Sequence, residues 1–412
     1  MSKKRIAIIG LKGLPPFGGA ANVGDNIIEQ LANEYDFTIY ATASHTHHKG
    51  PYKGAHQIVF KKFPIKQLNV FYYYIASAVH AVFTRRYDAI HLHQMDGAFI
   101  LLLLRLRYKV VATSHGLTYR ASKWSKWSHP YFKLNEWFQA RLSNHLTVVS
   151  KSLVPHYEKI VSPTRITYIP NGVNPIASAT LTPPAANLTP GVPATLTPPA
   201  ATPAASEYIL FAAGRILPIK GLHILLSALH KSGYKGKLIV LGDHSQLKDY
   251  SRGIFDLAAG LDVEFKGLIK EKALLNTWIA GARLFVFPST HEAMSMMLLE
   301  VASLRTPVIC SDIIQNTDIF DPDEMLFFRS DSDTDLAEKL GWALAHPGDM
   351  QTFAENAFRA LMDKFQWSII ARQYAGIFEN ITAKHQKPPT YTDQPPAPTN
   401  QTPPPTNQPH SI

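Results

Sequence analysis

The sequence predicts an α/β protein of two domains, each with a doubly wound parallel sheet, that face each other across a cleft. Its 412 residues, 46% of them hydrophobic, are enough to form two ordinary cores. Residues 175–206 are rich in Pro, Thr and Ala and carry no charge, which predicts a flexible linker. On both sides of this linker, strand-like and helix-like patterns alternate, as they do in parallel sheets covered by helices.

Before the linker, short apolar strands alternate with helical stretches. An amphipathic helix is expected over 25–35, and strands are expected at 5–10, 37–41, 89–93, 109–114, 145–150 and 165–169. After the linker the pattern repeats, with helices at 222–231 and 296–304 and strands at 208–212, 237–241, 263–266, 284–287 and 307–310. Because ligands bind at the carboxyl ends of the strands in such sheets, functional residues are expected just after strands.

Charge is distributed unevenly: residues 1–175 carry a net charge of +14 and residues 206–412 a net charge of −4. The basic half favours a phosphate-rich partner, namely nucleic acid, anionic lipid or a pyrophosphate-bearing substrate; a plain solubility bias is the alternative. With Cys310 as its single cysteine, the chain forms no internal disulfide framework. Its apolar runs are too short for a secretion signal or for the roughly 20 residues that span a bilayer. These features predict a cytoplasmic protein.

The segment 287–300 joins the end of a strand to the start of a helix. Ser295 is the expected N-cap of the helix that begins at Met296, whose free amides suit a phosphate. Glu292 lies in the loop. Glu300 lies inside an otherwise apolar helix, where a buried carboxylate needs a partner such as two ribose hydroxyls. The alternative is a capped helix with one glutamate in a salt bridge.

Two cations, Arg215 and Lys220, follow the strand 208–212 and are flanked by Gly214 and Gly221. Fixed cations at this position suit a pyrophosphate, whose charge must be neutralised when it leaves. The alternative is that both are solvated surface residues.

Two weaker signals lie before the linker. A glycine-rich loop that includes Gly18 and Gly19 separates a strand from a helix, as loops that approach phosphate or sugar closely do. Its spacing is neither the dinucleotide-binding pattern nor that of a P-loop. His115 ends another strand, where it is either a hydrogen-bond partner of a sugar hydroxyl or a structural histidine.

Taken together, these motifs resemble a family-four retaining glycosyltransferase (glycosyl transferases group 1) of the GT-B fold, in which two Rossmann-like domains face each other across a cleft. The match covers most of residues 5–380 except the linker. It rests on Gly18-Gly19, His115-Gly116, 169–173, Gly214-Arg215, Lys220-Gly221, Glu292 with Glu300, 306–309, Ser311-Asp312, Phe365, Trp367 and Tyr374. Residues 115–124 also resemble the rhamnosyltransferase-like branch, which usually lacks a glutamate at the position of Glu292. Ala293 stands where the family often has glycine.

The resemblance implies a role for each candidate residue. Arg215 and Lys220 would bind the donor diphosphate, Glu300 the ribose, and Glu292 with nearby amides the donor sugar. Ser295 and Met296 would present the helix terminus to the donor, Gly18 and Gly19 would let their loop close over the phosphates, and His115 would contact the transferred sugar. The family needs no metal and no cofactor, because the nucleotide-sugar is a co-substrate.

The domain organisation implied is an acceptor-side domain over 1–174, the linker over 175–206 and a nucleotide-sugar-binding domain over 207–366. A final helix over 367–384 would cross back to the first domain, and a disordered tail would occupy 385–412. The expected function is transfer of a hexosyl or deoxyhexosyl group to a glycan or lipid-linked acceptor in cell-surface polysaccharide or glycolipid synthesis. Alternatives are another GT-B enzyme (a nucleotide-sugar epimerase or a phosphorylase) and a non-catalytic membrane- or sugar-binding relative. No nucleic-acid-binding motif is found.

Basic and aromatic residues gather in two stretches of the first half. Lys61 and Lys62 precede the aromatic run 71–75, and Lys123 adjoins Trp124. Such combinations suit an anionic membrane surface, which predicts a peripheral protein at the inner face of a membrane. The alternative is a helix packed on its own sheet.

Overall fold

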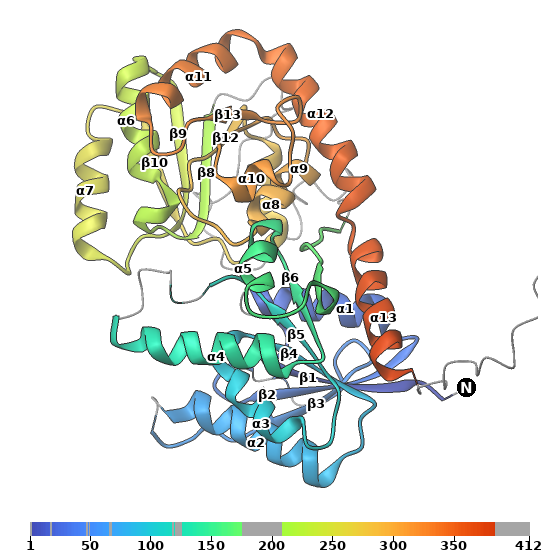
Figure 1. Ribbon diagram of the computed structural model, residues 1–412. Helices are drawn as coiled ribbons and strands as arrows, with labels where there is room; N and C mark the ends of the chain where they lie inside the picture. The colour runs from blue at the N-terminus through green and yellow to red at the C-terminus, as the bar shows by residue number, and fades with distance from the viewer. Residues whose placement is uncertain are drawn as a thin grey trace, which may run out of the picture.

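The computed structural model describes residues 2–16, 19–46, 48, 50–65, 68–117, 119, 126–174 and 208–383. The predicted linker 175–206 and tail 385–412 lie outside the described residues, as do Gly18, Lys123 and Trp124. The described chain forms two parallel sheets with helices on both faces, one below the other in Figure 1. The predicted fold class, two doubly wound α/β units of the GT-B type, is therefore confirmed.

The first sheet has seven parallel strands in the order β3-β2-β1-β4-β5-β6-β7. Its strands are β1 (Lys4–Lys12), β2 (Tyr35–Thr42), β3 (His56–Phe60), β4 (Ala89–His93), β5 (Val110–Ser114), β6 (His145–Val148) and β7 (Ile166–Tyr168). Its helices are α1 (Gly19–Leu31), α2 (Asn69–Thr84), α3 (Leu101–Leu104), α4 (His129–Leu142) and α5 (Val154–Glu158).

The second sheet has six parallel strands in the order β10-β9-β8-β11-β12-β13. Its strands are β8 (Tyr208–Arg215), β9 (Lys237–Asp243), β10 (Val263–Gly267), β11 (Leu284–Phe287), β12 (Val308–Ser311) and β13 (Leu326–Phe328). Its helices are α6 (Leu222–Ser232), α7 (Lys248–Ala258), α8 (Lys272–Ala280), α9 (Met296–Ser303), α10 (Ile314–Thr317), α11 (Asp333–Ala345) and α12 (Pro347–Lys364).

Strand order reverses once in each sheet, between β1 and β4 in the first and between β8 and β11 in the second. At such a switch point the connections leave the sheet in opposite directions and open a crevice at the carboxyl ends of the strands. Most candidate residues follow these strands, and His115 follows the neighbouring β5. Gly10 lies near the end of β1 and His93 ends β4, whereas Gly214 lies near the end of β8 and Pro288 follows β11.

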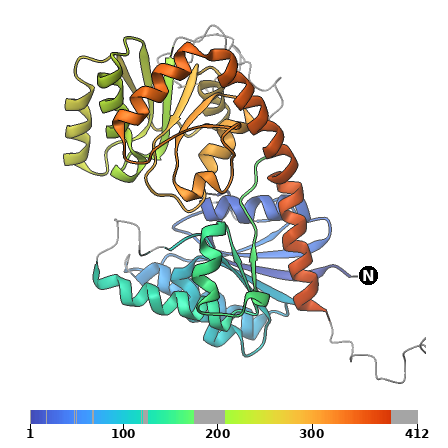
Figure 2. The ribbon, with the colours of Figure 1, turned by 45° about the horizontal axis from the view of Figure 1, so that its top comes forward.

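The last helix, α13 (Trp367–Thr382), follows α12 but packs against the first sheet rather than the second, as Figures 1 and 2 show. Its buried residues Trp367, Ile370, Tyr374 and Phe378 belong to the same core as residues of β1, β2 and α1. At its far end the hydroxyl of Tyr35 donates a hydrogen bond to Glu379 (2.8 Å). Two segments of the chain therefore connect the two sheets: the residues before the linker, and α13.

Element bounds differ from the prediction in a few places. α1 begins at Gly19 and ends at Leu31, rather than covering 25–35, because Tyr35 is already the first residue of β2 and is buried in its core. The edge strands β3 and β13 are not predicted: β3 is only partly buried, and β13 has three residues. Within the described residues, no helix is both long and apolar enough to cross a bilayer.

Candidate donor and acceptor sites between the two sheets

A cavity of about 380 Å³ lies between α1 of the first sheet and the carboxyl edge of the second. It brings together six of the predicted site residues: Gly19, Lys220, Glu292, Ser295, Met296 and Glu300. The strand ends Ala212, Ala213, Gly214 and Phe287 line it as well. Residues separated by up to 281 positions in the sequence thus share one cavity at the switch point of the second sheet.

Lys220 and Glu292 form an ion pair in this cavity, with 2.5 Å between Nζ and Oε1. The side chains are mostly buried, with 24% of Lys220 and 11% of Glu292 exposed. Each charge is therefore compensated by the other. A ligand that carries its own negative charge can replace Glu292 as the partner of Lys220, which would leave the carboxylate for a neutral group of the same ligand.

The two loops that carry this pair are fixed to each other. The backbone N–H of Thr290 donates to the carbonyl of Ile219 (2.9 Å). Gly221 has a φ of +72°, and a Cβ at this position would lie 1.9 Å from the carbonyl oxygen of Pro288, so only glycine fits. The Lys220–Glu292 geometry therefore follows from the close approach of two strand-end loops.

The start of α9 closes the cavity on one side. The Oγ of Ser295 accepts a hydrogen bond from the N–H of Leu298 (3.4 Å), which makes Ser295 the N-cap, as predicted. The remaining free amides of this first turn lie beside Met296 and Met297, which line the cavity. This terminus supplies partial positive charge next to Lys220.

Glu300, one turn further along α9, forms an ion pair with Lys272 at the start of α8. The carboxylate is 15% exposed, whereas Lys272 is 53% exposed. The predicted alternative, a glutamate of this helix in a salt bridge, is thus present, and the same carboxylate also lines the cavity. Lys272 can turn to solvent when a ligand approaches, since its stem is exposed and flexible.

Arg215 and His115 lie outside the lining of this cavity. Arg215 is the last residue of β8 and is exposed, and within the described chain its guanidinium has no hydrogen-bond or salt-bridge partner. Gly19, at the start of α1, does line the cavity, and a Cβ at this position would have no neighbour within 4 Å. The space beside Gly19 is therefore open rather than filled by packed atoms.

His115 belongs to a row of three histidines at the ends of β4 and β5. Its Nε2 lies 3.0 Å from Nδ1 of His93, and the ring of His93 lies 4.0 Å from that of His91, centre to centre. Burial lowers the pKa of His115 to about 4 and that of His91 to about 3, and it holds the pKa of His93 well below its usual value. All three are neutral at pH 7.

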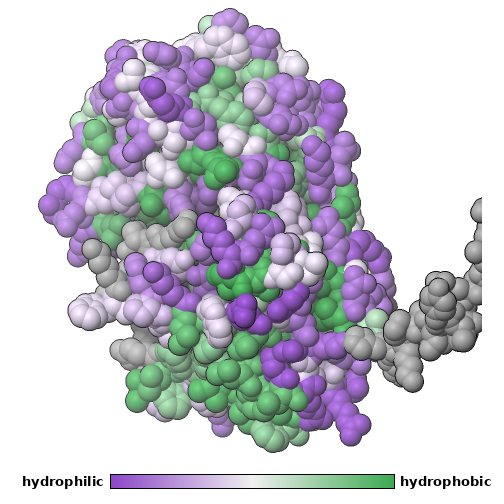
Figure 3. All heavy atoms as spheres, in the orientation of Figure 1, coloured by the Kyte–Doolittle hydropathy of each residue, from purple (hydrophilic) through white to green (hydrophobic). Residues whose placement is uncertain are grey.

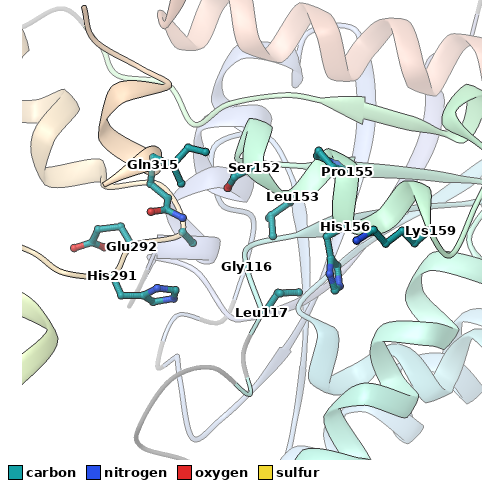
Figure 4. Close-up of a pocket in the computed structure, with 12 residues that line it drawn as sticks. Gly116, Leu117, Ser152, Leu153, Pro155, His156, Lys159, His291, Glu292 and Gln315 are labelled. Atoms are coloured by element: carbon teal, nitrogen blue, oxygen red, sulfur yellow. The ribbon is translucent and has the colours of Figure 1, made fainter. Parts of the chain in front are cut away.

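A second recess, of about 370 Å³, also has Glu292 in its lining. Figure 4 shows His291 and Glu292 on the loop before α9 at one side of this recess, with the Glu292 carboxylate turned away from it, and His156 and Lys159 at the other side, on α5 and the residue that follows it. His156 is held by Glu136, with 2.5 Å between Nε2 and Oε1. The recess is lined by residues of both sheets, and Glu292 is common to the two cavities.

The two sheets also touch directly beside Glu292. A Cβ on Gly116 would lie 2.7 Å from the Cβ of Ala293, and Gly116 has a φ of +109°. The N–H of Asn171 lies 3.0 Å from the sulfur of Met294. Ala293 and Met294 therefore both contact the first domain.

Comparison with known proteins agrees with this geometry. Residues 17–176 match the family described as Glycosyltransferase Family 4, and residues 198–360 match Glycosyl transferases group 1. The chain belongs to this glycosyltransferase family.

Relatives in sequence share about a quarter of their residues with this glycosyltransferase. An MMP alpha-(1->4)-mannosyltransferase of Mycolicibacterium hassiacum is 24% identical over 318 residues, 72% of each chain. A 2-deoxystreptamine N-acetyl-D-glucosaminyltransferase of Niallia circulans is 25% identical over 292 residues, 67% of each chain.

Solved structures share its fold. HepE of Anabaena, crystallised with UDP and glucose, superposes with a TM-score of 0.70 at 16% identity, over 92% of this chain and all of HepE. Sucrose-phosphate synthase of Thermosynechococcus elongatus superposes with a TM-score of 0.73 at 20% identity, over 92% of this chain and 99% of the synthase.

The sequence does not predict several residues that line the cavities or contact the candidate residues. His156 and Lys159 line the second recess, Lys272 pairs with Glu300 and His93 contacts His115; none of the four lies in a motif, and only the fold brings them to these positions. The alternation in Ala89–His93 places His91 and His93 on one face of β4, which is the single local signal for the histidine row. The described residues contain no group of three or more His, Cys, Asp or Glu placed to hold a metal ion.

Proposed function

We propose that this protein is a retaining glycosyltransferase that moves a hexosyl or deoxyhexosyl group from a nucleoside diphosphate sugar to a glycan or lipid-linked acceptor. The observation that carries the proposal is the cavity at the switch point of the second sheet. It holds one cation, one capped helix terminus and two carboxylates, which are the groups that a diphosphate, a sugar and a ribose require.

In this proposal the diphosphate replaces Glu292 as the ion-pair partner of Lys220 and accepts hydrogen bonds from the free amides at the start of α9. When the bond between the sugar and the β-phosphate breaks, the leaving oxygen gains negative charge. Lys220 and the amides stabilise that charge because they are already oriented. Arg215, exposed at the end of β8, is assigned to the outer phosphate oxygens once the cleft closes.

Glu292, released from Lys220, accepts hydrogen bonds from hydroxyls of the donor sugar. Glu300 leaves its ion pair with Lys272 and accepts hydrogen bonds from the two ribose hydroxyls. Gly19 lies opposite, where a small residue lets α1 approach the phosphates. His115 and Gly116 approach the sugar from the first sheet, beside Ala293. The acceptor enters through the second recess, which adjoins Glu292 and is lined by the first domain.

The positive charge supplied by these groups takes the place of a metal ion, so transfer should not require one. Sugar transfer is supported by the two curated relatives above, both of which are glycosyltransferases. A nucleotide-sugar donor is supported by HepE, whose structures contain UDP with glucose and UDP-glucose. The likeness of residues 115–124 to the rhamnosyltransferase-like branch keeps a deoxyhexose among the donors to be tested.

A direct test incubates the purified chain with a panel of nucleoside diphosphate sugars and acceptors in the presence of EDTA. The proposal predicts release of a nucleoside diphosphate together with a glycosylated product of unchanged anomeric configuration, read by NMR. Interconversion of two nucleotide-sugars without an acceptor would identify an epimerase instead. Phosphate-dependent release of a sugar phosphate would identify a phosphorylase, and no turnover with any donor would contradict the proposal.

A further inference from the structure

The helix α2 has an unusual outer face. Its 16 residues include no charged side chain. One face, which includes Tyr73, Tyr74, Ala78 and Ala81, is buried in the core of the first domain. The opposite face presents one large apolar residue per turn, and all four are exposed: Phe71, Ile75, Val79 and Phe83. An outer face of a globular helix is normally polar, so this one lacks the side chains expected of a surface in contact with water.

The apolar surface continues on the neighbouring helices. α3 packs against both α2 and α4, and the ring of Phe71 lies 5.6 Å from that of Tyr131 on α4. Exposed apolar side chains follow on each element, including Leu106, which is 78% exposed. We call the following residues the apolar face: Leu68, Phe71, Ile75, Val79, Phe83, Leu102, Leu106, Leu134 and Trp137. Figure 3 shows hydrophobic residues gathered at the end of the molecule where α2 and α3 lie.

Basic residues lie on, or next in sequence to, each helix that carries the apolar face. They are exposed, and they stand before α2, after α2, after α3 and on α4: Lys61, Lys62, Arg85, Arg86, Arg105, Arg107, Lys133 and Arg141. Acidic residues described in these stretches are Asp88, Asp96 and Glu136. Glu136 is buried, and Asp96 is held by Lys12 and by the hydroxyl of Tyr74. The face is therefore apolar at its centre and positive at its edge.

We propose that the apolar face docks on the surface of an anionic lipid bilayer. The side chains of α2 would enter the boundary between headgroups and acyl chains, and the surrounding arginines and lysines would contact lipid phosphates. A second copy of the chain fits less well, because a two-fold contact would set one basic edge against another. The docked protein would hold the acceptor-side domain at the membrane. The proposal goes beyond sugar transfer and does not depend on it.

The test is co-sedimentation of the full chain with vesicles of phosphatidylcholine alone and of phosphatidylcholine with phosphatidylglycerol. We expect binding to the anionic vesicles and little to the neutral ones. Arg85→Ala with Arg86→Ala should weaken partition about 30-fold, because each basic residue near such a surface contributes about 1 kcal/mol. The matched control, Lys248→Ala with Lys270→Ala, removes two exposed lysines of the second domain and should change little.

The apolar part is tested by Val79→Ser with Phe83→Ser, which should abolish sedimentation with vesicles. Leu247→Ser with Leu257→Ser, exposed on and beside α7, is the control that should bind normally. Unchanged circular dichroism and nucleoside diphosphate binding in each variant would show that the fold and the donor site are intact. The proposal is overturned if the wild type binds neither vesicle, if the controls lose binding equally, or if light scattering shows a dimer that the α2 variant dissociates without any vesicle binding.

Discussion

The polar groups on the two sides of the cleft differ in charge: one side carries ion pairs and the other carries uncharged histidines. On the side of the second sheet, two carboxylates are neutralised by lysines, Glu292 by Lys220 and Glu300 by Lys272. On the side of the first sheet, the groups at the strand ends are histidines that burial keeps uncharged. Ion pairs can exchange partners when a charged ligand arrives, whereas neutral rings can only donate or accept hydrogen bonds. This difference is consistent with the proposed function, in which the diphosphate binds at the second sheet and uncharged hydroxyls bind at the first.

The largest effect on activity is expected from Lys220, the cation on the second-sheet side of the cleft, which we call the charged side. Lys220→Met should lower turnover about 10²- to 10³-fold, the usual effect of removing a group that stabilises developing negative charge. The measurement is release of nucleoside diphosphate from the donor that wild type uses. Lys248→Met, exposed on α7 of the same domain, is the control. Turnover of the Lys220 variant within a few-fold of wild type would show that the pair has no part in catalysis.

The next largest effect should distinguish positioning of the donor sugar from binding of the diphosphate. Glu292→Gln should lower kcat about 10²-fold, because hydrogen bonds that position the sugar at the reacting carbon are lost. Affinity for a nucleoside diphosphate, which has no sugar, should stay within a few-fold of wild type. Calorimetric titration with the diphosphate and steady-state kinetics with the sugar donor measure the two quantities. A loss of diphosphate affinity as large as the loss in kcat would place Glu292 at the phosphates instead.

The uncharged histidines on the first-sheet side of the cleft should make the folded protein less stable in acid. Because the folded-state pKa values of His91 and His93 lie below the usual 6.5, the unfolded chain binds more protons as pH falls below 6.5. Stability is therefore unaffected at pH 7 and falls progressively as the pH drops from 6.5 towards the folded-state pKa, by about 2 kcal/mol at pH 5 for His91, whose folded-state pKa is about 3. Urea unfolding at pH 7 and pH 5 measures this loss. His93→Gln should make this loss of unfolding free energy smaller, because one of the two histidines is removed. An identical loss in the variant would show that His93 does not contribute to the acid sensitivity.

The smallest effect is expected from the more exposed ion pair. Lys272→Met should change stability by less than about 1 kcal/mol, since pairs with one exposed partner contribute little. If Glu300 must leave Lys272 to bind ribose, nucleoside diphosphates should bind a few-fold more tightly to the variant and inorganic pyrophosphate should bind equally. Tighter binding of both ligands would indicate a change in general charge rather than at the ribose.

The sequence predicts the core of this molecule well because buried parallel strands are continuous apolar runs bounded by glycine or polar residues. The ranges 89–93 and 284–287 agree with β4 and β11 at both ends. Ser295 and the loop position of Glu292 also follow from local pattern. Edge strands such as β13 leave no comparable pattern, and the start of α1 at Gly19 is hidden by the glycines before it.

Other features could not be read locally because they depend on contacts between distant segments. Lys272 stands 28 positions before its partner Glu300, and nothing in its own segment marks it. The sequence shows that 71–75 is aromatic, but α2 is apolar on both faces, so only the fold reveals which residues remain exposed. Arg215 was placed beside Lys220 by sequence, yet the described cavity is lined by Lys220 without it.

We propose that the second-sheet side of the cleft binds a nucleoside diphosphate through Lys220. It is tested most directly by the shift in melting temperature that nucleoside diphosphates and their sugar esters cause in wild type and in Lys220→Met, since a ligand of the folded state raises that temperature by mass action. We expect at least one nucleotide to raise the melting temperature of the wild type and the variant to lose most of that shift. No shift with any nucleotide, or an equal shift in both proteins, would contradict it.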